Sequence, residues 1–272
     1  MKLIIKKMLF FFLVISILTV GFYSNNGYVD DTKESNNNNV VIIEELQMSD
    51  YWDEDDVDFI HIYNDNWSAS KDPWIKDDLG TFDNPHIIEN VTINGQNSRT
   101  CILIEDCSDY FIISNCTLYN SGKTGSGSSA DVAGIVLKNT NNGRLIGNNC
   151  SFNNDSSGIY LINSHNNILI NNTANNNYYF GIYLFISENN KIQNNTANSN
   201  YGMGEDSAGL YLQSAINNTI HNNTFNLNVH GIFGKQFTTN NTISENIINN
   251  NTHYGIEPVS YTHLTLPTIL LV

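Results

Sequence analysis

A short apolar motif that begins with glycine recurs along the chain, and it constrains the fold more than any other feature. The motif reads GIVL, GIYL, GIYL, GLYL, GIFG and GIEP, starting at Gly134, Gly158, Gly181, Gly209, Gly231 and Gly255. Successive copies are 24, 23, 28, 22 and 24 residues apart. Repeats of this length are typical of solenoids, in which one unit buries its apolar face only by stacking on the next.

Each repeat contains short strands and leaves no room for a helix. Side chains alternate along a strand, so the Ile and Leu of GIYL lie on one face and the Tyr on the other. A second motif, an apolar residue two positions before an Asn pair, recurs at Leu169, Ile192 and Ile220. The signature of leucine-rich repeats, which have a similar period, is absent. The sequence therefore predicts an all-β fold, a single right-handed parallel β-helix of about 22–24 residues per coil over residues 85–258.

Asparagine, which is abundant in these coils, has a structural role in this fold. It tolerates the left-handed backbone of tight turns, and stacked Asn side chains form hydrogen-bonded ladders. We expect such a ladder along the helix axis at Asn149, Asn172, Asn195, Asn223 and Asn246.

The segments that flank the coils have other compositions. Residues 1–24 carry three lysines and then an apolar run, which predicts a signal peptide or an N-terminal anchor and hence a secreted or extracytoplasmic cell-surface protein. Residues 25–40 are expected to be a polar linker and residues 41–84 an N-terminal capping segment. Residues 259–272 break the repeat and resemble translated sequencing adapter, so we expect a non-native tail and a natural protein with further coils.

The charge of the chain excludes one class of partner. Lys and Arg number 12 against 27 Asp and Glu, a formal net charge of −15. Nucleic-acid binding needs a basic surface and is therefore not expected, and membrane contact is expected only through an uncleaved N-terminal segment. The acidic residues lack the spacing of a calcium-binding loop, so calcium has no motif to support it and neither a metal nor a cofactor is predicted.

Four cysteines lie in the coil region or beside it: Cys101, Cys107, Cys116 and Cys150. An exported protein can form disulfides, and stacked neighbours in adjacent coils lie near disulfide reach. The sequence suggests a Cys116–Cys150 bond, with buried free thiols that pack as small apolar residues as the alternative.

The G-I-x-L and I-x-N-N elements, together with the stretch from Gly80 to Ile88, resemble the NosD-like parallel β-helix repeat family. That repeat belongs to a wider group of carbohydrate-binding and sugar-hydrolysing modules. The resemblance implies a substrate groove along the sheet that holds the G-I-x-L strands. Its outward aromatic residues would form a ladder that packs on sugar rings. The candidate contacts are Tyr160, Tyr183, Tyr211 and Phe233 on the strands, Tyr178, Tyr179 and Tyr201 in the adjoining turn, and the acidic Glu205 and Asp206.

The leading functional hypothesis is binding of a polysaccharide or surface glycan through this aromatic ladder. No catalytic residue is assigned, because no pair of carboxylates is seen on the groove strands, as a glycosidase requires. A polysaccharide lyase or glycoside hydrolase with active residues in missing coils stays open as an alternative. Two further alternatives are a structural surface or adhesion protein and NosD-like copper-site maturation, for which His230 and His253 are the nearest ligand pair.

Overall fold

The computed structural model describes residues 59–67, 75–76, 79–122, 132–202 and 206–258, and these fold as β-strands with no α-helix among them. The predicted signal segment, polar linker and tail, most of the predicted cap, and Glu205 lie outside the described residues. Within the described ranges no helix is long and apolar enough to cross a membrane.

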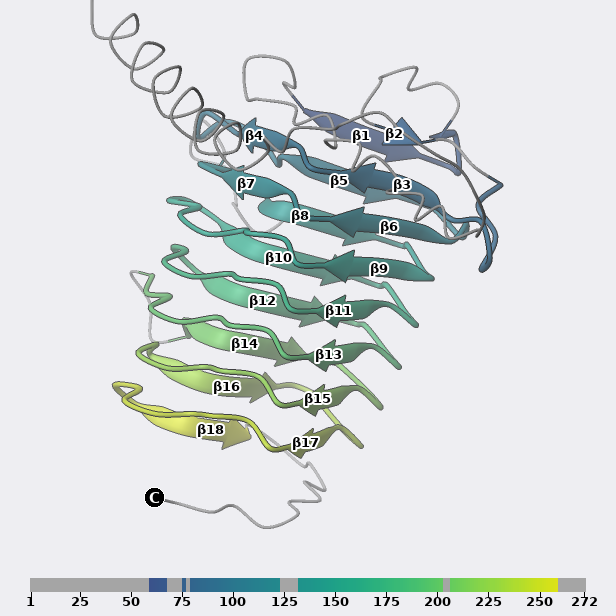
Figure 1. Ribbon diagram of the computed structural model, residues 1–272. Coiled ribbons are helices and arrows are strands. Elements are labelled where there is room, and N and C mark those ends of the chain that lie inside the picture. Colours follow the sequence, from purple (N-terminus) through teal and green to yellow (C-terminus); the bar gives the residue numbers. More distant parts are fainter. Residues whose placement is uncertain (1–58, 68–74, 77–78, 123–131, 203–205, 259–272) are drawn as a thin grey trace, which may run out of the picture. The chain divides into compact units, whose positions relative to one another are not determined.

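Two eight-stranded sheets and one two-stranded sheet build the solenoid (Figure 1). The first sheet contains β1 (Ile60–Tyr63), β5 (Ile102–Glu105), β8 (Ala133–Lys138), β10 (Ser157–Ile162), β12 (Phe180–Phe185), β14 (Ala208–Gln213), β16 (His230–Lys235) and β18 (Tyr254–Pro258). The second contains β2 (Ile75–Lys76), β3 (His86–Glu89), β6 (Phe111–Ser114), β9 (Gly143–Ile146), β11 (Ile168–Ile170), β13 (Lys191–Gln193), β15 (Thr219–His221) and β17 (Thr242–Ser244). The third pairs β4 (Thr92–Asn94) with β7 (Thr117–Tyr119).

Each strand pairs in parallel with the equivalent strand one coil further along, apart from the antiparallel pair β2–β3. The G-I-x-L motifs lie on the first sheet and the I-x-N-N motifs on the second, and single bridges continue the third face from Asn149 to Ile247. The predicted parallel β-solenoid is therefore confirmed. Its first strand, β1, pairs with β5 and so begins within the segment that was expected only to cap the coils.

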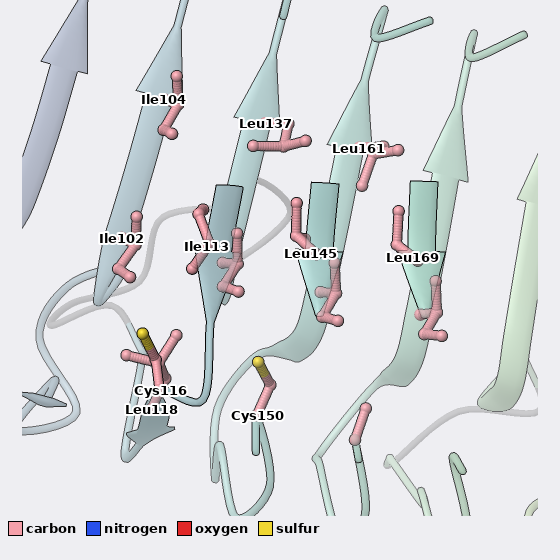
Figure 2. Packing of buried hydrophobic residues seen from close by; sticks show 14 of the residues in the cluster. Ile102, Ile104, Ile113, Cys116, Leu118, Leu137, Leu145, Cys150, Leu161 and Leu169 are labelled. Atoms are coloured by element: carbon pink, nitrogen blue, oxygen red, sulfur yellow. The ribbon is translucent and has the colours of Figure 1, made fainter. Parts of the chain in front are cut away.

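The core is a column of apolar side chains that point inward from all three faces. Ile182 and Leu184 reach it from the first sheet, Ile192 from the second and Ala197 from the third face. Figure 2 shows the same arrangement from Ile102 to Leu169, with one layer of side chains per coil. Glycine opens the motif because there is no space for a side chain: a Cβ on Gly181 would lie 2.4 Å from the Cβ of Ala197.

An asparagine ladder runs along the solenoid through Asn148, Asn172, Asn195, Asn223 and Asn246. Each amide nitrogen donates to the amide oxygen of the next rung at 2.9–3.0 Å. In each coil the residue before the ladder position has a left-handed backbone. In the first of these coils that residue is Gly147, with φ +67°, so Asn148 takes the ladder position. The prediction of Asn149 was wrong by one residue, because Asn149 is exposed and forms the bridge between Thr117 and Thr173.

Two further asparagine ladders escaped the sequence analysis. One is formed by Asn167, Asn190, Asn218 and Asn241, the other by Asn153, Asn177, Asn200, Asn228 and Asn251. Each again follows a left-handed residue, such as Asn166 at φ +57° or Asn176 at φ +55°. The first of these ladders is marked in the sequence by the same Asn-Asn pair. In the second ladder the residue before Asn varies and includes Phe152 and Leu227, so no fixed residue type marks it.

The four cysteines are buried free thiols, which corrects the suggested Cys116–Cys150 bond. Cys116 occupies the asparagine-ladder position of its coil, because Asn115 before it has φ +54° and its own backbone N–H donates to Asn148. Cys150 lies two residues beyond Asn148. Because Asn149 pairs with Thr117, Cys150 lies opposite Leu118 and belongs to a different inward row from Cys116. Burial raises the pKa of the Cys116 thiol to about 12.

Extra residues enter the coils at one turn, between the Asn153-type ladder position and the first sheet. Ser121 donates to Asn153 across 32 residues, whereas Asn153 and Asn177 are 24 residues apart. The ladder step from Asn200 to Asn228 is 28 residues. Both longer connections therefore lead into the same edge of the first sheet.

Candidate functional site

The side of the first sheet that faces away from the core carries three rows of side chains. We call this surface the outer face. The middle row reads His61, Leu103, Val136, Tyr160, Tyr183, Tyr211, Phe233 and Glu257. The row nearest the turn includes Phe180, Ala208, His230 and Tyr254. The row at the far end of the strands includes Glu105, Lys138, Ile162, Phe185, Gln213 and Lys235.

The aromatic ladder expected from the sequence occupies the middle row, at Tyr160, Tyr183, Tyr211 and Phe233. Tyr160 and Tyr183 stack at a centroid distance of 4.3 Å, and the next two steps are 4.8 and 5.3 Å. The rings therefore cover one another, and only 3% of Tyr160, 9% of Tyr183 and 5% of Tyr211 is exposed. This corrects the expectation that these ring faces are open to a ligand, because adjacent rungs are too close to leave a face free.

The aromatic surface that stays accessible lies beside the ladder. Phe180 and Phe185 are partly buried against it, and Phe180 stacks on Tyr211 at 4.4 Å. In the adjoining turns, Tyr178 and Tyr179 are half-buried and meet edge to face at 4.8 Å, while Tyr201 is 54% exposed. These three tyrosines are among the predicted contacts, whereas Phe180 and Phe185 are not, and the strand register places both phenylalanines next to the ladder.

Polar groups on this face form a short chain of neutral hydrogen bonds. The Tyr183 hydroxyl donates to Gln213 at 2.6 Å, and the Gln213 amide donates to Gln236 at 2.9 Å. Burial, with smaller contributions from Tyr183 and Asp206, raises the pKa of Tyr211 well above the ordinary value. Tyr211 is therefore an uncharged hydrogen-bonding group at neutral pH.

The charged residues of the outer face are arranged in pairs. Lys138 lies 2.5 Å from Glu105, and Lys235 lies 3.0 Å from Asp206. His230, which is 3% exposed, lies with Nδ1 3.0 Å from Glu257. Asp206, one of the two acidic candidates, is thus engaged with a lysine of the same face.

Potential metal ligands are sparse in the described ranges. The rings of His230 and His253 approach to a centroid distance of 5.3 Å, edge to face. No group of three or more His, Cys, Asp or Glu side chains that could hold a metal ion occurs among the residues that the structure describes.

These features define the class of the protein, a parallel β-solenoid with an aromatic ladder along the outer surface of one sheet. The chain belongs to the right-handed β-helix family, since the family model for the right-handed β-helix region matches residues 79–266.

Solved structures of two enzymes are similar to this chain at low sequence identity. A threonine-to-asparagine mutant of the periplasmic alginate epimerase AlgG matches 62% of this chain and 45% of its own, at 17% identity and a TM-score of 0.47. The A-module of the mannuronan C-5 epimerase AlgE4 from Azotobacter vinelandii matches 66% of this chain and 64% of its own, at 15% identity and a TM-score of 0.42. The chain thus spans less than half of the first protein. No curated protein matches the sequence.

Proposed function

We propose that this protein binds a polysaccharide or surface glycan outside the cytoplasm, along the outer face of the first sheet. The observation that carries the proposal is the continuous aromatic surface that crosses successive rungs there. The buried ladder forms its floor, and Phe180, Phe185 and Tyr201 offer the accessible rings. A chain of sugars can contact equivalent side chains rung after rung on such a surface, through its apolar ring faces and its hydroxyl groups.

Two other features support this reading. The basic and apolar residues at 1–24 have the pattern of an export signal, which would bring the solenoid to extracellular glycans. The G-I-x-L and I-x-N-N motifs resemble the NosD-like subfamily, whose wider group includes carbohydrate-binding modules. Binding has more support than catalysis, since Glu105 and Asp206 are each paired with a lysine.

The proposal is tested by affinity electrophoresis of the full chain through gels that contain different polysaccharides. Phe185→Ala and Tyr201→Ala remove accessible rings and are expected to weaken retardation by the bound polymer about fivefold or more. Phe82→Ala is the matched control, because Phe82 is 61% exposed and contacts Arg144 of the second sheet. Melting temperatures of the variants establish that each one is folded.

A structural surface or adhesion protein is the second candidate, and the burial of the ladder favours it. Stacked rings of which less than a tenth is exposed stabilise the sheet whether or not a ligand exists. If no polysaccharide retards the protein, or if Phe82→Ala weakens retardation as much as Phe185→Ala, the ladder is packing and this second function takes its place.

A further inference from the structure

We infer that the ligand of the outer face is an uncharged polysaccharide rather than an acidic one. This inference deepens the proposed function and rests on it. It is drawn from the pairing of the charges on the face, and it concerns the chemical class of the polymer.

The two lysines of the outer face are already neutralised within the protein. Lys138 is held by Glu105 at 2.5 Å and Lys235 by Asp206 at 3.0 Å. To bind a sugar carboxylate or sulfate, either lysine would have to leave a carboxylate partner, and the gain from the new ion pair would be offset by the loss of the old one.

The other described Lys and Arg side chains lie elsewhere. Lys76, Arg144 and Lys191 belong to strands of the second sheet, where Lys76 is paired with Glu89 and Arg144 lies over the ring of Phe82. Arg99 lies in the turn that leads into β5, near the N-terminal end of the stack. The rungs from β10 to β16 therefore present one described lysine on the outer face, Lys235, and it is paired.

Acidic groups on the outer face would repel a polyanion. Glu257 continues the middle row directly after Phe233, and its described neighbour is a histidine rather than a lysine. The whole chain carries a formal charge of −15. A polyuronate would bring one negative charge per sugar to a negatively charged protein and would lose hydration on contact without gaining counter-charges.

The uncharged groups of the outer face match neutral sugars. The face offers partly exposed aromatic rings, tyrosine hydroxyls and the amides of Gln213 and Gln236, which both donate and accept hydrogen bonds. Sugar C–H faces pack on such rings, and sugar hydroxyls form hydrogen bonds with such amides. Neither contact requires a charged group to leave water.

The test compares the full chain in gels or titrations with uncharged polymers (galactomannan, hydroxyethylcellulose, laminarin), acidic polymers (alginate, polygalacturonate) and the cationic polymer chitosan. Each is measured at low salt and at 0.5 M NaCl. We expect at least one uncharged polymer to bind at least about tenfold more tightly than any acidic one. Its affinity should change little when salt is added, because no counter-ions are released. Chitosan binding is expected to vanish in salt, as for a non-specific attraction.

Tighter binding of an acidic polymer, or chitosan binding that exceeds all others at 0.5 M NaCl, overturns the inference while leaving the proposed function in place. Binding of no polymer removes the proposed function and the inference with it.

Asp206→Asn supplies an independent check, because it frees Lys235 from its partner. We expect alginate affinity to rise severalfold relative to galactomannan affinity in this variant. Glu188→Gln changes the net charge equally but lies in the turn between β12 and β13, and it should leave both affinities unchanged. An equal rise in both variants would mean that overall charge, rather than the pairing on the outer face, sets the preference, and would overturn the argument.

Discussion

The inner asparagine ladders and the outer aromatic ladder both place one side chain on each rung, but they fix their residues in different ways. At Asn195 the amide oxygen accepts two hydrogen bonds from Asn172, and the amide nitrogen donates to Asn223 and to the carbonyl oxygens of Leu169 and Gln193. On the outer ladder, neighbouring rings meet at interplanar angles from 3° to 42°. The inner contacts are directional and buried, whereas the outer ones only require large apolar surfaces.

Because of this difference, the inner ladders set the register of the coils, whereas the outer face can vary with function. An amide that is displaced by one residue loses every partner at once, so the inner ladders fix which residues face each other in adjacent coils. Stacked rings tolerate substitution, and the same row accommodates Val136 and Phe233. The outer face can therefore change its side chains without changing the fold, as a binding surface must.

Breaking an inner ladder is expected to have the largest effect. Asn195→Ala leaves buried donors and acceptors on both neighbouring rungs unpaired, and should lower the free energy of unfolding by about 3 kcal/mol. Chemical denaturation measures the change. The adjacent Asn194, exposed and at φ +57°, is the control. Asn194→Ala should cost only about 1 kcal/mol, from the strained backbone and from the loss of one exposed hydrogen bond donated by Asn222. Equal losses in the two variants would contradict the role of the ladder.

Ionisation of Cys116, which occupies an asparagine-ladder position, should have the next largest effect. The folded-state pKa of Cys116 is about 12 against an ordinary value of 9.0. The neutral thiol therefore makes its full contribution to the free energy of unfolding below pH 9, and this contribution is lost as the pH rises towards 12. Between pH 8 and about pH 10.5 the native protein should lose about 2 kcal/mol more than Cys116→Ala does. Denaturation at the two pH values measures this difference, and identical losses would show that the thiol is not protected from ionisation.

Changing the outer ladder should cost less. Tyr183→Phe removes the hydroxyl that donates to Gln213 but keeps the ring stack, so the free energy of unfolding should fall by about 1 kcal/mol. The same denaturation assay measures it. A loss as large as that of Asn195→Ala would mean that the outer ladder, like the inner ones, depends on specific hydrogen bonds.

The smallest expected change is a gain. Ile186 occupies an exposed corner at φ +50°, a conformation that is strained for a β-branched residue and that asparagine adopts readily. Ile186→Asn should raise the melting temperature, with a gain of about 0.5 kcal/mol. A loss instead would indicate that the exposed Ile186 side chain makes a contact worth more than the strain.

The fold was predictable because the repeat appears directly in the sequence. The G-I-x-L and I-x-N-N spacings set both sheets, and the alternation of side chains correctly assigned Ile182 and Leu184 to the core and Tyr183 to the opposite face. The position of Asn149 was mispredicted because the Asn pair was aligned by its letters, whereas the backbone of Gly147 determines which residue of the turn points inward.

The accessibility of the candidate site could not be predicted in the same way. Alternation shows which face Tyr160 and Tyr211 occupy, but their burial depends on the spacing between rungs and on Phe180, which stacks across to the next coil. Likewise, the pairing of Lys235 with Asp206 joins residues 29 positions apart, one of them in the inserted turn. Such contacts between coils follow from the register of the stack, and the sequence pattern defines that register only to within one residue.

The three asparagine ladders advance along the chain in the same steps. The 28-residue step appears between Asn190 and Asn218, between Asn195 and Asn223, and between Asn200 and Asn228. From Asn167 onward, every coil thus presents the same set of amides to the coils on either side, whatever the length of its turn. A single coil is consequently a module that recombination can duplicate, delete or exchange at the gene level. Proteins of this design can lengthen, shorten or acquire new surface turns in evolution without having to solve the folding problem again.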